Sequence, residues 1–223
     1  ARRFLCSLIR LHHKVFDDAT PPTRTQIRVI ASGATFQAWS NLNDTIMGGS
    51  SQAGCRVTGD GLLLEGEVVS EGGGFVSCRS PVYKPPLDLS DFRGLRLSLD
   101  GQGRSFKFAV ACRDGVLGLT ELIPGGLRWV STVPTQSNGT TVVEIPFDQL
   151  KPVVRASPIN LPLRFDSSCI TRLQLLHSRF GDDGEANPGY RSGSIQLLIR
   201  SIEASEIVSC APLETLIAAA ADL

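Results

Sequence analysis

Two groups of acidic and amide side chains could bind a cation. Asn43 and Asp44 stand together just before a glycine pair, and Asp182, Asp183 and Glu185 lie close together in a later segment. Calcium takes about six to eight oxygen ligands, and either group alone supplies too few. We therefore expect Asn43 and Asp44 to cap a turn through side-chain to backbone hydrogen bonds, and Gly48 and Gly49 to accept positive φ in that turn. We expect the second group to be a solvated loop, and the chain to hold no metal.

Catalytic and cofactor chemistry find little support in the residues. A serine hydrolase needs a histidine base beside its nucleophile, but His177 shares its predicted strand face with Leu173 and Leu175. A half-buried, structural histidine is the expected outcome. The glycine runs at 48–49 and 72–74 lack the lysine and hydroxyl residue of a phosphate-binding P-loop. We therefore predict no catalytic residue, no bound cofactor and a protein that is not an enzyme.

Arginine and aromatic side chains raise two binding alternatives. A basic strip beside aromatic rings would suit RNA phosphates and bases, and two tryptophans could form a sugar-stacking platform. The residues concerned are Arg79, Arg96, Arg104, Arg128, Arg155 and Arg179, with Phe75, Phe180, Trp39 and Trp129. Acidic residues balance the arginines, and tryptophan more often fills a core. An RNA-binding factor and a carbohydrate or small-ligand module therefore remain as alternatives.

Alternating strands separated by glycine turns must position these groups. Between residues 95 and 110, apolar and polar side chains alternate on both sides of a Gly-Gln-Gly turn, which predicts a β-hairpin with one buried face. Similar runs occupy residues 62–69, 75–80, 127–133, 140–145, 170–177 and 194–202. This series of short strands predicts an all-β fold over residues 35–206, a two-sheet β-sandwich or jelly roll.

The two ends of the chain depart from the strand pattern. Residues 1–34 read as a basic segment and linker, and residues 1–16 carry four Lys or Arg with apolar side chains at helical spacing. That helix could be a targeting remnant, touch a membrane surface or a partner, or pack on the sandwich edge. Residues 207–223 predict a short C-terminal helix.

Length, charge and cysteine content limit the classes of protein to which this chain can belong. The 223 residues suit one domain, and Lys plus Arg equal Asp plus Glu at 22 each, so the global basic field of a dedicated nucleic-acid binder is missing. No apolar run approaches the roughly 18 residues of a membrane span. The six cysteines are widely separated and include no Cys-x-x-Cys pair, so we expect reduced thiols and no zinc.

Two glycine-rich blocks carry a resemblance to a known family. The first runs from Trp39 through Asn43-Asp44 to Met47-Gly48-Gly49, and the second is Gly-Gly-Phe-Val-Ser-Cys-Arg at 73–79. In order and spacing they resemble the signature of the complex I intermediate-associated protein 30 family, also called NADH dehydrogenase assembly factor 1. Further matches extend the resemblance over residues 36–205. Some segments look most like plant and cyanobacterial versions, which are linked to photosystem II biogenesis.

The resemblance implies a galactose-binding-domain-like jelly roll that acts as a non-catalytic assembly factor. Its partners would be subunits or assembly intermediates of NADH dehydrogenase-type complex I or of photosystem II. The implied location is the cytoplasm or plastid stroma beside the thylakoid membrane, or alternatively the mitochondrial matrix. We expect the signature loops and residues 151–155 to form the partner-binding face. Its predicted members are Asn43, Asp44, Met47, Gly48, Gly49, Gly74, Phe75, Arg79 and Arg155.

Overall fold

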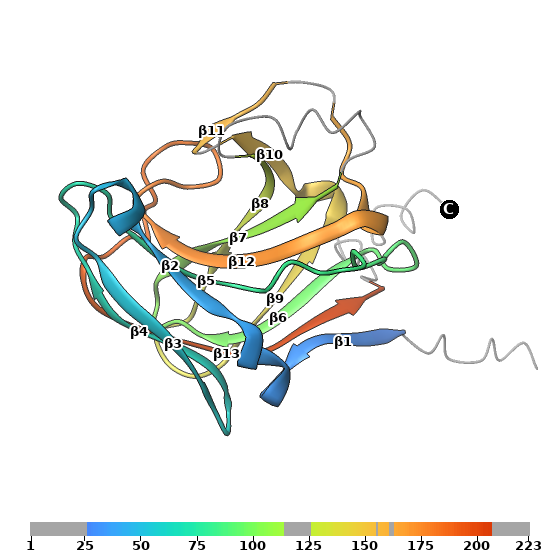
Figure 1. The fold of residues 1–223 in the computed structure, drawn as a ribbon, viewed down its shortest axis with the longest axis horizontal. Coiled ribbons are helices and arrows are strands. Elements are labelled where there is room, and N and C mark those ends of the chain that lie inside the picture. The colour runs from blue at the N-terminus through green and yellow to red at the C-terminus, as the bar shows by residue number, and fades with distance from the viewer. Residues whose placement is uncertain (1–25, 114–125, 155, 161–162, 207–223) are drawn as a thin grey trace, which may run out of the picture.

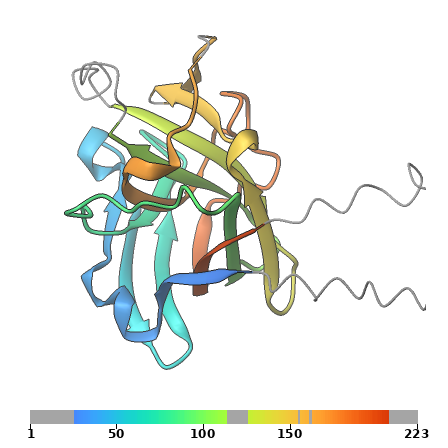
Figure 2. The ribbon, with the colours of Figure 1, turned by 90° about the vertical axis from the view of Figure 1, so that its right-hand side faces the viewer.

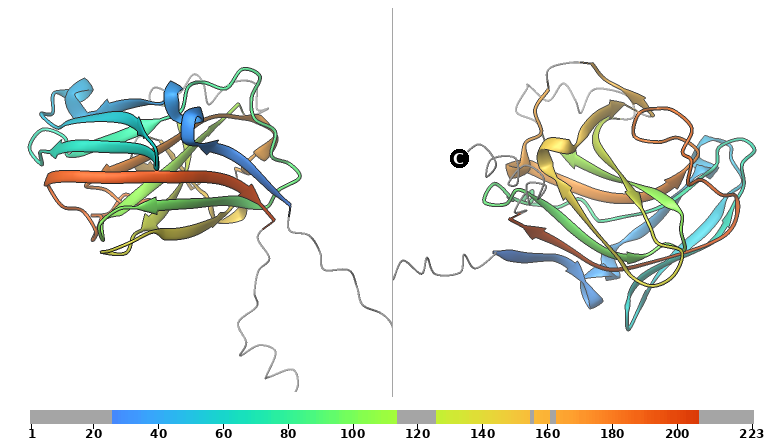
Figure 3. Two further views of the ribbon diagram at one scale, coloured as in Figure 1. Left: turned by 90° about the horizontal axis from the view of Figure 1, so that it is seen from below. Right: turned by 180° about the vertical axis from the view of Figure 1, so that it is seen from behind.

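Two antiparallel sheets face each other in this protein (Figure 1). A computed structural model describes residues 26–113, 126–154, 156–160 and 163–206. The helices predicted at 1–16 and 207–223, and the arginine at position 155, lie outside these ranges. Figure 2 and Figure 3 show the same two layers from other directions. The architecture confirms the predicted all-β, two-sheet sandwich.

The two sheets and four short 3₁₀ helices make up the regular structure of the described residues. The first sheet has six strands: β1 (Ile27–Ser32), β3 (Gln52–Thr58), β4 (Gly61–Val68), β6 (Gly94–Asp100), β9 (Thr141–Pro146) and β13 (Gly193–Ser205). The second has seven: β2 (Ser40–Asn43), β5 (Phe75–Arg79), β7 (Ser105–Cys112), β8 (Leu127–Pro134), β10 (Lys151–Val154), β11 (Ser157–Pro158) and β12 (Ile170–Ser178). The 3₁₀ helices are η1 (Gly33–Ala38), η2 (Asp44–Met47), η3 (Phe147–Gln149) and η4 (Ser167–Cys169).

Strand order explains which groups meet. The six-stranded sheet runs β3–β4–β13–β6–β9, with β1 also paired to β13, and the seven-stranded sheet runs β11–β10–β8–β7–β12–β5–β2. The long strand β13 lies inside its sheet, where it pairs with β4, β6 and β1 (Figure 3, left). Neighbours in each sheet are often far apart in sequence, so residues from distant segments are brought onto one face.

The predicted hairpin between residues 95 and 110 is wrong in its pairing. Its strands β6 and β7 exist, but β6 pairs with β9 and β13 while β7 pairs with β8 and β12. The turn at 101–104 therefore passes from one sheet to the other. Leu97 and Phe108 are both fully buried, because each strand directs its apolar side chains into the space between the sheets. Alternation reveals the buried face of a strand but not its neighbours.

The sandwich begins earlier than residue 35. Strand β1 pairs with β13, with Ile27 opposite Ser205, so part of the predicted linker belongs to the six-stranded sheet. Ile27 and Val29 are about half exposed on this edge strand, while Ala31 is buried. The burial pattern is too weak for the alternation rule to detect, since only the end of the strand faces the core.

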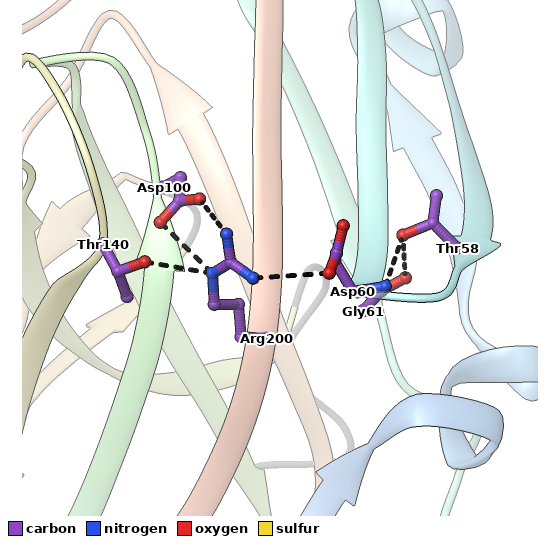
Figure 4. Close-up of polar contacts among 6 residues, drawn as sticks. All are labelled: Thr58, Asp60, Gly61, Asp100, Thr140 and Arg200. Atoms are coloured by element: carbon purple, nitrogen blue, oxygen red, sulfur yellow. Dashed lines mark hydrogen bonds and ion pairs between the residues drawn. The ribbon is translucent and has the colours of Figure 1, made fainter.

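The guanidinium group of Arg200 on β13 contacts side chains from three other segments (Figure 4). Arg200 Nη2 donates to Asp100 Oδ2 at 2.7 Å, and Arg200 Nε donates to Thr140 Oγ1 at 3.0 Å. Its Nη1 also lies 3.8 Å from Asp60 Oδ1 in the β3–β4 turn. Because the Arg200 side chain is partly exposed, we expect this cluster to stabilise the fold only modestly.

Within the ranges that the structure describes, no helix has the length and apolar character needed to cross a bilayer. The cysteines at positions 55, 78 and 169 are free thiols.

Candidate functional site

The buried carboxylate of Asp44 ties the two glycine-rich blocks together. Its Oδ2 accepts hydrogen bonds from Ser51 Oγ at 2.6 Å, from Gly74 N at 2.6 Å and from Phe75 N at 3.2 Å. Its Oδ1 accepts from Ser51 N at 2.9 Å. Asp44 is the first residue of η2, whereas Gly74 and Phe75 lead into β5. One side chain thus fixes two loops that are distant in sequence and side by side in space (Figure 1).

The charge state of Asp44 follows from these contacts. Burial alone would raise the pKa of its carboxyl group, but the Ser51 hydroxyl and the backbone N–H groups of Gly74, Ser51 and Phe75 outweigh that effect. The net pKa of Asp44 is lowered from 3.8. The group is therefore a carboxylate at neutral pH, held by charge-assisted hydrogen bonds.

Glycines make room for this carboxylate. A Cβ added at Gly49 would lie 2.4 Å from Asp44 Cγ, and one added at Gly73 would lie 2.5 Å from Asp44 Cβ. Of the two glycines expected to need positive φ, Gly48 has it at 88°, as the C-cap of η2. Gly49 does not have positive φ, so that expectation is wrong. What requires glycine at this position is the close approach of the carboxylate rather than the backbone angle.

Several residues predicted to contact a partner are instead buried or half-buried and stabilise the loops. Asp44 is 0% exposed, so the prediction that it contacts a partner directly is wrong. Gly74 is also buried and packs against the side chains of Arg179 and Tyr190. Asn43 is half-buried, and its Nδ2 donates to Ala53 O of β3 at 2.9 Å. Its side chain makes no capping hydrogen bond to η2, so the turn-capping role expected of Asn43 is wrong. The turn-capping role expected of Asp44 is present, but it extends to a second loop that the sequence did not reveal.

A groove on the outer face of the seven-stranded sheet brings the exposed part of the signature together with other segments. Its volume is about 330 Å³. Met47 and Phe75 come from the two signature blocks, and Val153 comes from the third predicted segment. The floor is apolar, and Phe180 lies at the mouth. The groove is lined by Leu42, Met47, Gly73, Phe75, Lys107, Ala109, Arg128, Val130, Val153, Ala156, Gln174, Leu176, Ser178 and Phe180.

The remaining predicted members lie near this groove. Arg79 is on β5, opposite Gln174 of β12, and Gln174 lines the groove. Gly48 is exposed beside Met47, and Gly49 is half-buried behind it. The structure thus places Met47, Phe75 and Arg79 on one face, with Asn43, Asp44, Gly49 and Gly74 beneath or beside it.

The acidic loop partners two lysines at one side of the groove. Lys107 is buried, and its Nζ donates to Gly181 O at 3.0 Å. Burial lowers the pKa of Lys107, while the nearby Asp182 and Asp183 raise it. Lys151 Nζ lies 3.3 Å from Asp182 Oδ1. Among the described residues no group of three or more His, Cys, Asp or Glu side chains is arranged to hold a metal.

His177 is a fully buried structural residue, more enclosed than the half-buried side chain we expected. Its Nδ1 lies 3.0 Å from Ser105 O, and its Nε2 lies 3.1 Å from Arg191 O and 3.2 Å from Arg191 N. Its ring stacks on that of Tyr190 at 5.1 Å. Burial lowers the pKa of His177 below 6.5, so the ring is neutral and both nitrogens are engaged.

The two tryptophans are not available as a sugar platform. Trp39 is 8% exposed and packs edge-on against Phe36, while Trp129 is 4% exposed and packs against Phe165. Both fill the core, so this form of the carbohydrate alternative is wrong. Sequence reasoning also missed Gln174 and Leu176, whose outward position in β12 follows from the alternation of that strand once its inward residues are known.

Comparison with solved structures shows the same fold in carbohydrate-binding modules. The family 11 carbohydrate-binding module of the cellulosomal cellulase Lic26A-Cel5E of Clostridium thermocellum has a TM-score of 0.57 at 14% identity, over 80% of this chain and 94% of that one. The family 11 module from the same organism in complex with a β-1,3-1,4-mixed-linked tetrasaccharide has a TM-score of 0.55, also at 14% identity, over 80% and 94% of the two chains. At this identity the likeness concerns the fold, which is the galactose-binding-like β-sandwich.

Sequence comparison gives the family. A search of curated proteins finds no significant match. The family model for complex I intermediate-associated protein 30 matches residues 29–199, which include both glycine-rich blocks and most of the two sheets. The chain therefore belongs to the complex I intermediate-associated protein 30 family.

Proposed function

We propose that this protein is a non-catalytic assembly factor for NADH dehydrogenase-type complex I that holds a segment of a subunit in the groove. The family supports an assembly role. The groove offers a rigid apolar floor on a sheet, and a rigid site lowers the entropic cost of binding. The proposal places the protein at the surface of the membrane that contains the complex, in the mitochondrial matrix or on the cytoplasmic or stromal side.

The observation that carries this proposal is the exposed apolar edge at the groove mouth. Ile46 and Met47 are 65% and 68% exposed, and Phe180 is 44% exposed. Exposed apolar patches mark interaction sites, and methionine adapts to varied partners. Met47 is the last residue of η2, whose first residue is Asp44. The buried half of the family signature therefore holds its exposed half in position.

The site chemistry supports a binding role rather than catalysis. His177 is neutral, buried and bonded at both ring nitrogens, so it is not free to accept a proton from a nucleophile. Lys107 is bonded to a backbone carbonyl. The groove instead combines apolar contacts with a few polar groups at its edges, as protein-binding surfaces do.

A carbohydrate ligand is the second candidate, because the shared fold includes a module bound to a tetrasaccharide. In this chain the groove floor consists of Ala109, Val130, Val153 and Leu176. The rings in the groove lining on which a sugar could stack are those of Phe75 and Phe180. Titration calorimetry with the β-1,3-1,4-mixed-linked tetrasaccharide tests this directly. Saturable binding that Leu176→Asp abolishes would favour the carbohydrate role over the assembly role.

Affinity capture from membranes in mild detergent tests the leading proposal. We expect the wild-type protein to recover complex I subunits and Met47→Asp to lose them, because a charge at the groove mouth must be desolvated on binding. Val142→Asp is the matched control, since Val142 is 50% exposed on β9 of the other sheet. Circular dichroism must show that both variants are folded.

The capture has two outcomes that contradict the proposal. If Met47→Asp keeps the full set of subunits, the binding surface lies outside the groove mouth. If photosystem II subunits are recovered in place of complex I subunits, the chain serves the photosynthetic complex. Recovery of RNA that ribonuclease treatment removes together with all proteins would support the RNA-binding alternative.

A further inference from the structure

Three arginines gather on the outer face of the seven-stranded sheet, at the end of the groove away from Met47. Arg128 lies on β8, Arg172 on β12 and Arg79 on β5. Arg172 of β12 lies opposite Ala111 of β7. On the other side of β7, Trp129 lies opposite Val110, so Arg128, one residue earlier, lies beside Ala111. The small side chain of Ala111 therefore separates two arginines, with Arg79 on the next strand.

These positive charges are not compensated within the described part of the chain. Arg128 Nη1 donates to Leu127 O at 2.8 Å, which is a neutral acceptor. The Nε of Arg172 is buried without a hydrogen-bond partner, and no ion pair is found for the three arginines among the described residues. Burial lowers the pKa of Arg128, the charges of Arg172 and Arg79 lower it further, and Cys112 acts in the opposite direction without reversing the shift. Burial and the charge of Arg79 likewise lower the pKa of Arg172.

Two lysines provide an internal contrast: Lys107, which lines the groove, and Lys151, which does not line it but pairs with the same acidic loop. Lys107 has the Gly181 carbonyl and two nearby aspartates, and Lys151 has Asp182. Among the described residues, the lysines beside the acidic loop therefore have acidic partners, whereas the three arginines have none and repel one another. Like charges held together without counter-charges raise the free energy of the folded protein. An anion that binds among them therefore gains a favourable electrostatic interaction with all three guanidinium groups.

The shape of the groove indicates the form of the ligand. Gln174, Leu176 and Ser178 of β12 line the groove, and Arg172 lies two residues before Gln174 on the same strand. From Arg172 to Ser178 the strand advances six residues, a length of about 20 Å at roughly 3.3 Å per residue. An extended peptide of about six residues matches this length. Between the arginines and the mouth, the floor consists of Ala109, Val130, Val153 and Leu176. The ligand thus meets guanidinium groups at one end and apolar surface along the rest.

We propose that Arg79, Arg128 and Arg172 bind the carboxylates of an acidic peptide segment of the partner, with its adjacent apolar side chains on the Leu176 floor. This inference rests on the proposed function, because it gives the chemistry of the segment held in the groove. Guanidinium groups match carboxylates with paired hydrogen bonds. Uncompensated arginines also exclude basic segments through repulsion, which makes the site selective.

Selection from a displayed library of random hexapeptides tests the inference on the full chain. We expect wild-type protein to enrich peptides with Asp or Glu next to Leu, Ile or Phe. The double variant Arg79→Gln with Arg172→Gln should lose the acidic enrichment, and the best selected peptide should bind it about tenfold or more weakly, as for lost charge-assisted bonds. Arg96→Gln on β6 of the other sheet is the control and should bind the peptide like the wild type.

Thermal unfolding separates a ligand site from a structural one. Because the arginines repel one another, Arg79→Gln and Arg172→Gln should leave the midpoint unchanged or raise it. A lowered midpoint together with unchanged peptide selection would make the cluster a structural feature and overturn the inference. A selection without acidic enrichment, or with equal enrichment by the double variant, would also overturn it.

Vesicles distinguish a lipid headgroup from a peptide. The probe is phosphatidylcholine vesicles containing about one third phosphatidylglycerol, in sedimentation with wild type and the double variant. Arginine-dependent sedimentation that displaces the selected peptide would assign the site to lipid and overturn the peptide inference. If Met47→Asp loses complex I subunits while the double variant keeps them, the inference fails and the proposed function stands. If both variants keep them, both proposals fail.

Discussion

Replacing Asp44 with asparagine should destabilise the fold by about 2 to 4 kcal/mol. If the amide oxygen keeps the three donors of Oδ2, the new NH₂ faces Ser51 N, so one bond of 2.9 Å becomes a contact between two donors. An unsatisfied buried donor costs about 1 to 3 kcal/mol, and each remaining bond loses charge assistance worth about 1 kcal/mol. The smaller cost of burying a neutral amide offsets part of this sum.

Guanidinium unfolding at pH 7 measures this loss, with Asp166→Asn as the matched control. Asp166 also accepts from a serine N–H and hydroxyl, at 2.9 and 2.6 Å, but it is half-exposed at the N-cap of η4. Asparagine caps as well as aspartate, so the control should lose less than about 0.5 kcal/mol.

The pH dependence provides a second check on Asp44. Because the folded pKa of Asp44 is lowered from 3.8, its charge stabilises the fold fully above the unfolded pKa. This stabilisation is lost as the pH falls through the folded pKa. The stability difference between the wild type and Asp44→Asn should therefore shrink below about pH 4. A loss under about 0.5 kcal/mol at pH 7, or a difference that is the same at pH 3, would refute the reasoning.

Three further predictions follow from the described contacts. Gly49→Ala should cost about 1 to 3 kcal/mol in urea unfolding because its Cβ would lie 2.4 Å from Asp44 Cγ, whereas Gly54→Ala, with nothing within 4 Å, should cost nothing measurable; equal effects would contradict this. Because burial holds the folded pKa of His177 below 6.5, the unfolded chain takes up the proton first, so thermal stability should fall between pH 7 and 5 more in the wild type than in His177→Gln; parallel curves would contradict the assignment. Arg200→Met should cost no more than about 1 kcal/mol in urea unfolding, because its ion pairs are partly exposed; a loss above about 3 kcal/mol would show a larger role.

The strands could be predicted because alternation is a local property. Leu95, Leu97 and Leu99 are buried as their period of two indicates. Pairing could not be predicted in the same way, since β6 and β7 are adjacent in sequence yet lie in different sheets. The Gly-Gln-Gly turn suits a hairpin and an inter-sheet connection equally, and only the long-range partners of each strand decide between them.

The site was predictable only in its composition. The signature identified Met47, Phe75 and Arg79 as residues of interest, and all three lie on or beside the groove face. The sequence could not show that Asp44 is buried while these three residues lie on the surface, because a buried carboxylate and an exposed one can have the same neighbours in sequence. Asp44 is buried only because Gly74 and Phe75, far along the chain, supply N–H donors.

Arg172 shows a further limit of sequence reasoning. A strand arginine is ordinarily solvated, and the residues next to Arg172 in sequence do not distinguish it from such an arginine. In the sheet, Arg172 lies near Arg79 and Arg128 from two other strands. The three arginines come close together only because β5, β12, β7 and β8 are neighbours in the sheet. A pattern within one strand therefore cannot reveal this cluster of positive charge.

Site-specific photo-crosslinking in native membranes tests the central claim most directly. A photoreactive residue at Leu176, in the groove floor, is compared with one at Val142, on the opposite sheet. Identification of the crosslinked proteins by mass spectrometry should give a subunit of NADH dehydrogenase-type complex I from position 176 and none from position 142. The same subunit captured equally from both positions, or captured only from position 142, would contradict the claim that the groove holds the partner.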